Sequence, residues 1–333
     1  RVINTVELDG DFVQTADGHL EFDVAFGSYD SDRVNVTGDA TVDGTGDITL
    51  IWLENSEDVT LFATGGAGAD NGLEISDTLA LDYSIRADAE GVHLGFVSDF
   101  GQDFLNQNGQ ALGGSIDSAL LVGGASGIGR LAALLGNMRA GDEDIYAAVF
   151  TELDPSPHME PLQLQFANAN SFSNELFGCM NVVAQSGDQC VWASLERTRR
   201  ESVGDFENFG TATSGIRLRA GFEQAAWGPW SVATSIGYDD IEHMRVDDLR
   251  SFSDGKSLNL GVGMRRTDVR GLEAGVALSG GWQWMDTERQ MNIFGPQTGT
   301  SSPESRYVQL SGHLAHLARH GSFFARPALN ASV

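Results

Sequence analysis

The sequence predicts a mostly β protein with three parts, which we place at residues 1–103, 104–178 and 189–333. The first part is predicted to be the last rungs of a β-solenoid, because short alternating strands are separated by Gly and Asp turns. The last part is predicted to be the first seven or so strands of an incomplete antiparallel transmembrane β-barrel, because longer strands alternate apolar residues with small or polar ones. A helical linker joins the two. The 41 glycines and the charged fraction of 20% fit a β-rich, turn-rich chain.

The charge of the chain is strongly negative and unevenly distributed. The formal net charge is −27, which argues against a nucleic-acid partner because binding to phosphates needs basic patches. Residues 1–104 contain 22 Asp and Glu against 3 Arg, so −19 of the total lies in the first third. This asymmetry predicts different functions for the first part and for the rest.

Strict alternation of apolar and polar residues identifies the strands of the first part. It occurs at 19–24, 33–37 and 40–43, and the pattern predicts further strands at 48–52, 59–63, 79–85 and 92–96. Turn dipeptides such as Asp17-Gly18 and Asp43-Gly44 separate many of these strands. Such strands favour stacked rungs, each burying its inner face against the next. A two-sheet sandwich is the alternative for this part.

The most informative segment of the linker is a predicted helix at about 157–177. Ser156 is a good N-cap and Pro157 suits the first helical position. No charged residue occurs between Glu160 and Glu175. At about 1.5 Å per residue the helix would be roughly 30 Å long, the thickness of a bilayer core. The pattern predicts an apolar face of Leu162, Phe166, Ala169, Phe172 and Leu176, and an opposite face of Gln163, Gln165, Asn168, Asn170 and Asn174. Because the helix is too polar to face lipid, we expect it inside a water-filled pore.

From residue 190 onward, strands of about ten residues carry an apolar and a polar face. Leu258, Leu260 and Val262 alternate with Asn259, Gly261 and Gly263, and the same pattern recurs at 215–222, 230–239, 272–284 and 308–314. The strands of a soluble sandwich also alternate apolar and polar residues, so the lengths of the connections must distinguish a sandwich from a membrane barrel. Those near 228, 271 and 321 are predicted to be tight, and those at 201–209, 239–254 and 288–305 long and polar. Outer-membrane barrels have short periplasmic turns and long outward loops.

This alternation predicts how the chain is threaded. With the long loops outside, the strand from Cys190 starts at the periplasmic end, so the preceding helix begins outside. About seven strands fit before Val333, and an open sheet cannot lie in lipid with unpaired edges, so we expect further strands in the complete protein. The sequence has no initiating Met and no run of 18 apolar residues, which favours a fragment or processed form without a membrane-spanning apolar helix.

The order of parts resembles the C-terminal region of a monomeric autotransporter of the type Va secretion class. The stretches that carry the resemblance are Asp11-Phe12-Val13-Gln14-Thr15, Gly18-His19-Leu20, Asp32-Arg33-Val34-Asn35-Val36-Thr37-Gly38-Asp39-Ala40, Leu105-Asn106-Gln107, Ile145-Tyr146-Ala147-Ala148-Val149-Phe150, Leu153-Asp154-Pro155 and Cys190-Val191-Trp192-Ala193. The resemblance implies a right-handed β-helical passenger at the cell surface and a twelve-stranded translocator with a helix in its pore. It also implies the outer membrane of a Gram-negative bacterium as location. The implied partners are outer-membrane lipid, the barrel-assembly machinery and the protein's own passenger.

The sequence departs from that family pattern by ending before the terminal strands. The aromatic C-terminal signal that the barrel-assembly machinery reads is not in the sequence, so we expect that residues 1–333 alone do not insert into a membrane.

Two other motifs are better explained by structure than by ligand binding. The run Val122-Gly123-Gly124-Ala125-Ser126-Gly127-Ile128-Gly129-Arg130 resembles the nucleotide loop of short-chain dehydrogenases, which must follow a strand, and a helix is predicted before it. The only lysine, Lys256, has Phe252 four residues earlier, so the Tyr-x-x-x-Lys pair of that family is impossible. Residues 65–70 match the opening of a calcium-binding nonapeptide, but no second copy adjoins them, and we predict a loop. We expect no nucleotide, metal, cofactor or catalytic residues.

The predicted pore-lining residues are Arg217, Arg219, Arg265 and Arg326 from the sheet, with Gln163 and Asn170 from the helix. The arginines either hydrogen-bond the helix and set the electrostatics of the pore, or keep the interior hydrated. Cys179 and Cys190 could close a disulfide in an oxidising compartment, and two unpaired thiols are the alternative.

The function expected from these features is non-catalytic. The barrel anchors the chain in the outer membrane and exports and displays its passenger, whose own activity would lie upstream of Arg1. The alternative is an outer-membrane adhesin whose acidic β-domain binds a partner directly.

Overall fold

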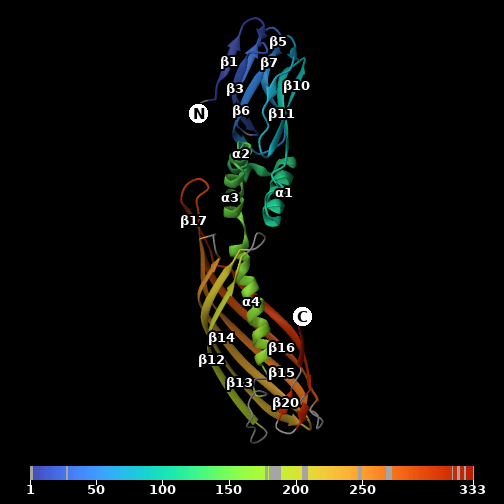
Figure 1. Ribbon diagram of the computed structural model, residues 1–333, viewed down its shortest axis with the longest axis vertical. Helices are drawn as coiled ribbons and strands as arrows, with labels where there is room; N and C mark the ends of the chain where they lie inside the picture. The colour runs from blue at the N-terminus through green and yellow to red at the C-terminus, as the bar shows by residue number, and fades with distance from the viewer. Residues whose placement is uncertain are drawn as a thin grey trace. The chain divides into compact units, whose positions relative to one another are not determined.

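The computed structural model is mostly β, with four α-helices and a large antiparallel sheet in the part of the chain that it describes (Figure 1). The described residues are 3–27, 29–176, 179, 189–204, 209–246, 250–267, 272–316, 318–320, 323–325 and 328–332. They form two compact units, Arg1–Asp154 and Pro155–Val333. The helices of the predicted linker are therefore divided, since three belong to the first unit and the fourth to the second.

Strands of the first unit pair in parallel at a regular spacing. Val6 pairs with Val34, and Val34 pairs with Phe62, so the chain returns to the same position after 28 residues. Three such stacks form from β1 (Thr5–Leu8), β4 (Arg33–Val36) and β7 (Val59–Thr64), from β2 (Phe12–Val13), β5 (Ala40–Val42) and β8 (Gly68–Asp70), and from β3 (His19–Phe26), β6 (Thr45–Leu53) and β9 (Glu74–Ile75). The predicted loop at 65–70 is wrong in its second half, because β8 occupies Gly68–Asp70.

Stacked side chains and repeated turn contacts explain this spacing. Phe62 contacts the rings of Phe12 and Phe22, with centroid distances of 4.9 and 5.8 Å, inside the buried core. In the turns, Asp11 Oδ1 accepts a hydrogen bond from Asp39 N at 2.9 Å. Asp39 Oδ1 accepts one from Ala67 N at 2.8 Å, again 28 residues further on. The same carboxylate contact thus repeats in successive coils.

A hairpin and three helices complete the first unit. β10 (Leu81–Asp88) and β11 (Gly91–Ser98) are antiparallel, and β11 pairs antiparallel with β7, which ends the parallel stack. The amide of Asn137 bonds both Leu50 N and Leu50 O, at 2.8 and 2.7 Å, and joins the end of one helix to β6. The hydroxyl of Tyr146 donates to Phe100 O at 3.0 Å. The helices are α1 (Gln107–Leu121), α2 (Gly129–Gly136) and α3 (Glu143–Leu153), with a 3-10 turn at Ala125–Gly127. The glycine-rich run at 122–130 therefore follows a helix and no strand.

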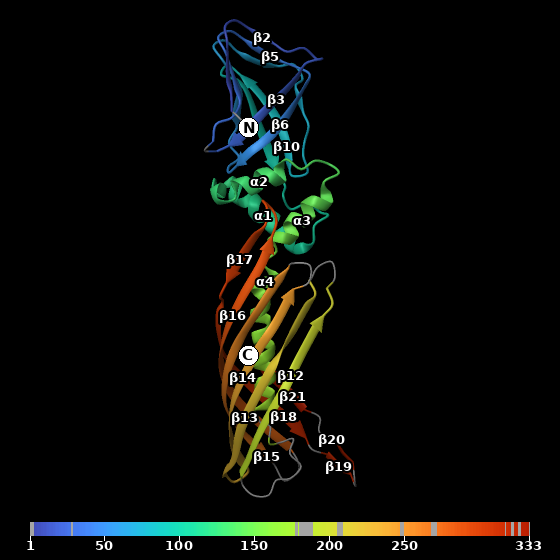
Figure 2. The same cartoon turned by 90° about the vertical axis from the view of Figure 1, so that its left-hand side faces the viewer.

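Seven strands follow one another as an antiparallel meander in the second unit (Figure 2). They are β12 (Gln189–Ser202), β13 (Thr211–Trp227), β14 (Trp230–Val246), β15 (Ser251–Thr267), β16 (Leu272–Met291), β18 (Glu304–His316) and β21 (Ala328–Ser332). A short strand, β17 (Gln297–Ser301), pairs antiparallel with the end of β16, and β19 (Ala318–His320) pairs with β20 (Phe323–Ala325). The number and order of strands agree with the sequence pattern.

The two faces of this sheet differ in the direction that the alternation predicted. Leu195, Val276 and Leu310 are 75%, 54% and 54% exposed on the outer face. On the other face Asn259 and Gln283 are each 1% exposed. The apolar face of the sheet thus has no protein cover among the described residues, while its polar face is buried.

The predicted strand lengths and the predicted alternation of loop lengths are wrong. The strands β12–β16 have 14 to 20 residues, whereas about ten were expected. The connection 247–250 is as short as the connection 268–271, because most of the predicted long loop at 239–254 is paired strand. Asp239 pairs with Ser257, and Arg245 with Phe252. These pairs continue the ladder beyond the stretches of regular apolar alternation, where a pattern of hydrophobicity gives no signal.

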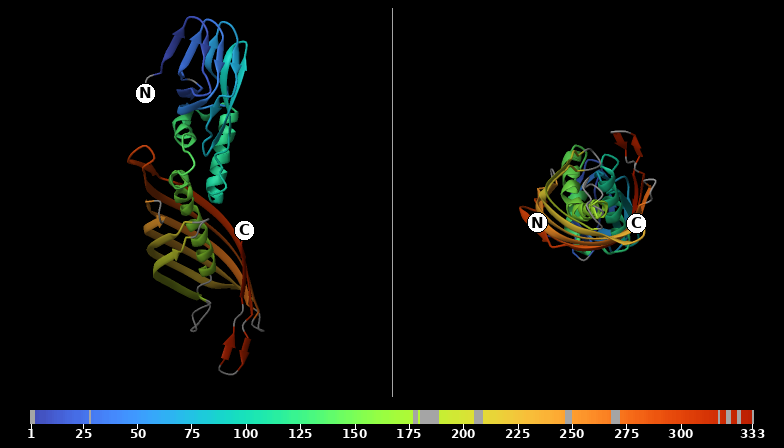
Figure 3. Two further views of the ribbon diagram at one scale, coloured as in Figure 1. Left: turned by 45° about the horizontal axis from the view of Figure 1, so that its top comes forward. Right: turned by 90° about the horizontal axis from the view of Figure 1, so that it is seen from below.

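Helix α4 (Ser156–Glu175) packs on the polar face, and the sheet curves around it (Figure 3). It contacts β14, β15, β16 and β18. The predicted apolar face is partly wrong, because Leu162 and Phe166 are 36% and 68% exposed. Ser156 was predicted as the N-cap, but it is the first helical residue, and the N-cap position is held by Pro155. The buried residues of the helix are Pro157, Pro161, Gln165, Asn168, Ala169, Phe172 and Ser173. Among the described residues, no helix combines the length and the hydropathy that a membrane crossing requires.

Candidate functional site

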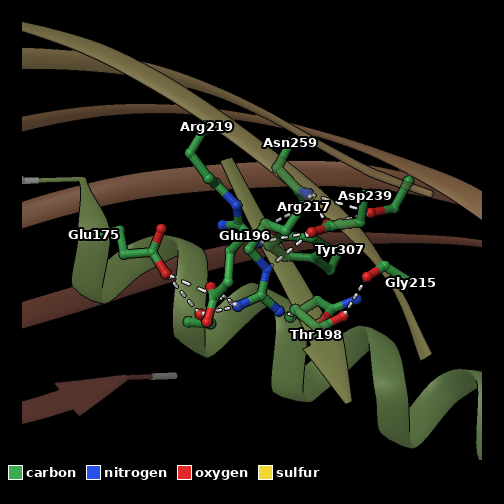
Figure 4. Close-up of polar contacts among 12 residues, drawn as sticks. Glu175, Glu196, Thr198, Gly215, Arg217, Arg219, Asp239, Asn259 and Tyr307 are labelled. Atoms are coloured by element: carbon green, nitrogen blue, oxygen red, sulfur yellow. Dashed lines mark hydrogen bonds and ion pairs between the residues drawn. The ribbon is translucent and has the colours of Figure 1, made fainter. Parts of the chain in front are cut away.

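Two arginines of β13 and a carboxylate of β14 form the centre of the contact between sheet and helix (Figure 4). Arg217 and Arg219 are two positions apart on one strand, so both point to the same face. Asp239 is the cross-strand neighbour of Arg217. Its Oδ1 accepts hydrogen bonds from Arg217 Nε at 3.1 Å and from Arg219 Nη2 at 3.0 Å. The single negative charge of Asp239 therefore compensates only part of the two positive charges of Arg217 and Arg219.

The other oxygen of Asp239 is held by β15. Ser257 Oγ donates to Oδ2 at 2.6 Å and Asn259 Nδ2 donates at 3.0 Å. Tyr307 of β18 donates its hydroxyl proton to Asn259 Oδ1 at 2.9 Å. Asp239 is only 4% exposed, and its four donors are Arg217, Arg219, Ser257 and Asn259, which replace the water that a carboxylate would otherwise bind. The network extends across four strands.

Arg217 connects this network to the helix. Its Nη1 donates to Ser171 Oγ and its Nη2 to Asn168 Oδ1, both at 3.0 Å. The carboxylates of Glu175 on α4 and Glu196 on β12 lie 3.9 and 3.7 Å from Nη1. A single guanidinium thus bridges the helix and two strands, which fixes the rotation of α4 about its axis.

Arg219 is fully buried and stacks on the helix. Its guanidinium carbon lies 5.0 Å from the centre of the Phe172 ring. Its Nε and Nη1 have no hydrogen-bond partner among the described residues. The ring can approach because the sheet has glycines beneath it: a Cβ on Gly261 would lie 2.3 Å from Leu176 Cδ1, and one on Gly237 would lie 3.0 Å from the Phe172 ring. The sheet therefore has a recess for the helix.

Amide and hydroxyl pairs hold the rest of α4. Ser173 Oγ donates to Gln309 Oε1 at 2.9 Å, and Gln309 Nε2 donates to Asn170 Oδ1 at 2.6 Å. Near the start of the helix, Gln283 Nε2 donates to Pro161 O at 2.7 Å. Polar residues of the helix are thus matched by polar residues of the sheet, beside apolar contacts such as those of Leu164 with Ile241, Met244 and Met285.

The remaining predicted pore-lining residues differ in their surroundings. Arg265 is buried and pairs with Glu223, which also accepts from Ser231 Oγ at 2.6 Å, and these contacts lie within the sheet. Gln163 is on the exposed side of α4. Arg326 lies outside the described residues. The sequence reasoning did not single out Asp239, the centre of the network: the alternation placed it at the end of a strand's polar face, and a long loop was predicted to begin at the same residue.

A disulfide joins the segment after α4 to the first strand of the sheet. Cys179 and Cys190 are bonded, with their Cα atoms 6.1 Å apart. The disulfide therefore anchors the end of the helical segment to β12. The sequence left open a disulfide or two unpaired thiols, and the structure has the disulfide.

No family model, curated protein or solved structure matched this chain. The function must therefore be argued from the geometry. Within the described residues no group of three or more His, Cys, Asp or Glu side chains is placed to hold a metal ion. The acidic and basic groups of the site are held in a hydrogen-bond network between helix and sheet, an arrangement that can position α4 and set the charge of the surface around it.

Proposed function

We propose that this protein is the translocator unit of an autotransporter. In this proposal the sheet is part of a β-barrel in the outer membrane of a Gram-negative bacterium, and α4 occupies its pore. The first unit is the end of a β-solenoid passenger that the protein exports and displays on the cell surface. The function is export and anchoring, without catalysis.

The observation that carries the proposal is the inverted polarity of the sheet. Burying one large apolar side chain gives about 1.5–3 kcal/mol, so a soluble sheet covers its apolar face and leaves its polar face in water. Here Val276 and Leu310 are exposed while Asn259 and Gln283 are buried under a helix. A continuous apolar face on seven adjacent strands is suited to lipid.

The requirements of a lipid environment support further details of the proposal. Unpaired strand edges are unstable in hydrocarbon, so β12 and β21 would each need a neighbouring strand in a closed barrel. Helix α4, with 20 residues, is roughly 30 Å long and matches the thickness of the hydrocarbon core. Its hydrogen bonds to the polar face suit a segment that fills a pore. The barrel-assembly machinery is the partner that such a barrel needs for insertion.

The parallel stacks of the first unit support a passenger made of coils. Strands of successive coils pair at a spacing of 28 residues. In the turns, the carboxylates of Asp11 and Asp39 each accept a hydrogen bond from the backbone amide 28 residues further on, at Asp39 and Ala67. A two-sheet sandwich would instead use antiparallel neighbours. Strands β1, β2 and β3 are each at the end of a stack, where a preceding coil could pair.

Protease treatment of intact cells tests this function. The protein is produced from its complete gene in a Gram-negative host, and outer-membrane fractions are probed for the two units after proteinase K is added outside. We expect the first unit to be degraded in intact cells and the second unit to be protected and to fractionate with the outer membrane. A first unit that is cut only after cell lysis, or a second unit in the soluble fraction, would contradict the proposal.

A further inference from the structure

A groove of about 360 Å³ lies on the outer face of the sheet, where Trp230, Met264 and Val276 border it. It extends over β14, β15, β16, β18 and β21, near the end of the sheet at which β13 and β14 are joined. Its lining is almost entirely apolar, and we call it the apolar groove. Sites for small molecules have volumes of about 300–1,000 Å³, so the groove is large enough for one hydrocarbon chain.

The register of the strands explains why this face has a groove. Three positions of its floor carry small residues, namely Ala274 of β16, Gly312 of β18 and Ala331 of β21. Val276 lies opposite Gly312, and Leu314 lies opposite Ala274, so large side chains stand beside the small ones. A Cβ added at Gly312 would meet no neighbouring heavy atom within 4 Å. The groove is therefore open space on a continuous sheet.

A positive charge lies beside the groove. Arg266 of β15 is the cross-strand neighbour of Trp230 and of Ala274, which both line the groove. Its side chain is exposed, and it forms no hydrogen bond or ion pair with another described residue. Two positions further into the strands, Met264 lies opposite Val276. The surface thus changes from a cation at the end of the sheet to apolar side chains further in, which suits a ligand with an anionic head and an apolar tail.

Two tryptophans mark the depth of this end in a membrane. Trp227 and Trp230 flank the turn between β13 and β14, and Trp227 is 60% exposed. Aromatic side chains of transmembrane barrels gather at the two interfaces, at the level of the lipid headgroups. Because Arg266 is level with Trp230, its guanidinium group would lie among headgroups, and the groove would run from there into the hydrocarbon.

The position of the groove indicates which leaflet it would contact. His158 Nδ1, near the start of α4, lies 3.1 Å from Ser301 Oγ of β17, so the chain enters the second unit at the end where β16 and β18 are joined. The antiparallel order of the strands puts the turn between β13 and β14 at the opposite end. If the first unit is displayed outside, as the proposed function holds, the groove contacts the periplasmic leaflet.

We infer that the apolar groove binds one acyl chain of a glycerophospholipid of the periplasmic leaflet, and that Arg266 pairs with the phosphate of this lipid. The planar guanidinium group can donate to two phosphate oxygens at once. A lipid held at both points occupies a fixed site, unlike the lipids that only border the apolar face. The inference rests on the proposed function for the membrane and for the leaflet.

Native mass spectrometry of the complete protein in detergent micelles tests the inference with three probes. They are phosphatidylglycerol with two oleoyl chains, dioleoylglycerol, which has the same chains and no phosphate, and glycerophosphoglycerol, which has the headgroup and no chains. We expect phosphatidylglycerol to bind at least about tenfold more tightly than dioleoylglycerol, the equivalent of one charge-assisted contact. Glycerophosphoglycerol in excess should not displace it, because the headgroup alone makes no contact with the groove.

Two variants separate the groove from the cation. Gly312→Leu fills the open space and should weaken the binding of both lipids about tenfold, because the contacts of the chain are lost. Arg266→Gln should abolish the preference for phosphatidylglycerol and leave the binding of dioleoylglycerol unchanged. The matched controls are Val308→Leu, on the outer face of β18 and outside the groove, and Lys256→Gln, an exposed cation on the same face near the other end of β15. Both controls should bind as the natural protein does.

Five outcomes would overturn the inference: equal binding of the two lipids, displacement by glycerophosphoglycerol, unchanged binding in Gly312→Leu, an unchanged preference in Arg266→Gln, or an equal loss in the controls. Circular dichroism shows whether each variant is folded. If Gly312→Leu does not fold, Ala331→Leu fills the same groove from the neighbouring strand, at an exposed position.

Fractionation and protease treatment of cells that produce the natural protein separate the two proposals. If the first unit is displayed and the second unit is in the outer membrane, but the lipid preference is absent, the groove assignment fails alone. If the protein is not in the outer membrane, both fail.

Discussion

Asp239 is the residue whose replacement should most weaken the contact between the helix and the sheet. In Asp239→Asn, two guanidinium groups with 15% and 0% exposed side chains lose their shared negative charge. Removing one partner of a buried ion pair costs about 3–5 kcal/mol, because a buried charge is left without compensation. We expect the free energy of unfolding to fall by that amount.

The matched substitution Arg219→Met should cost less than about 1 kcal/mol, although Arg219 is the more buried partner. Asp239 then keeps Arg217, Ser257 and Asn259 as donors. Methionine is apolar, of similar length, and makes favourable contacts with an aromatic ring such as that of Phe172. The two nitrogens of Arg219 that lack hydrogen-bond partners among the described residues, Nε and Nη1, are removed together with its charge.

Urea unfolding of the complete protein in lipid vesicles, followed by tryptophan emission, measures both costs. In the Arg219→Met background, Asp239→Asn should cost less than it does alone, because only Arg217 loses its partner. Equal costs for the two single variants would refute the reasoning, as would a cost below about 1 kcal/mol for Asp239→Asn.

Three further predictions concern both units. Burial, reinforced by the charges of Asp117 and Asp99, raises the pKa of the Tyr146 hydroxyl. The contribution of Tyr146 to the stability of the first unit should therefore be fully present below about pH 10 and fall as the pH rises above it. Thermal melts at pH 9 to 11 measure this dependence, and Tyr146→Phe should weaken it. Reduction of the Cys179–Cys190 disulfide should lower the free energy of unfolding of the second unit by about 2–3 kcal/mol in urea titrations, and Cys179→Ser/Cys190→Ser should reproduce the loss and be insensitive to reductant. Asp39→Ala should increase the hydrogen-exchange rate of the Ala67 amide about tenfold, whereas the exposed control Asp30→Ala should leave it unchanged; an equal effect of both would exclude the turn contact.

The sequence predicted well which side chains of a strand lie on each face of the sheet, because successive side chains of a strand point to opposite faces. The faces of five strands, including the opposite exposures of Leu260 and Asn259, follow from the alternation at 215–222, 230–239, 258–263, 272–284 and 308–314. The 28-residue spacing of the first unit had a signal in the sequence, since Asp11 and Asp39 occupy equivalent turns, but their register is clear only from the pairing.

The features that sequence reasoning missed depend on long-range contacts. Phe166 was assigned to a buried face because an amphipathic helix usually buries its apolar side, but the sheet beneath α4 is itself polar and selects Gln165 and Asn168. Asp239 was placed at the end of a strand's polar face, and a long loop was predicted to begin there because the hydrophobic alternation ends, although the strand continues to Val246.

The environment of a spin label on the outer face of β16 shows directly whether the apolar face of the sheet lies against lipid. The label is placed at Leu278, which is 50% exposed, and at Glu288, which lies on the same face nearer the end of the strand, in the complete protein in its outer membrane. The account predicts that the Leu278 label is reached by oxygen and not by a water-soluble nickel chelate, while the Glu288 label is reached by the chelate. A Leu278 label that the chelate reaches, or that neither reagent reaches, would place this face against water or protein and contradict the lipid-facing sheet.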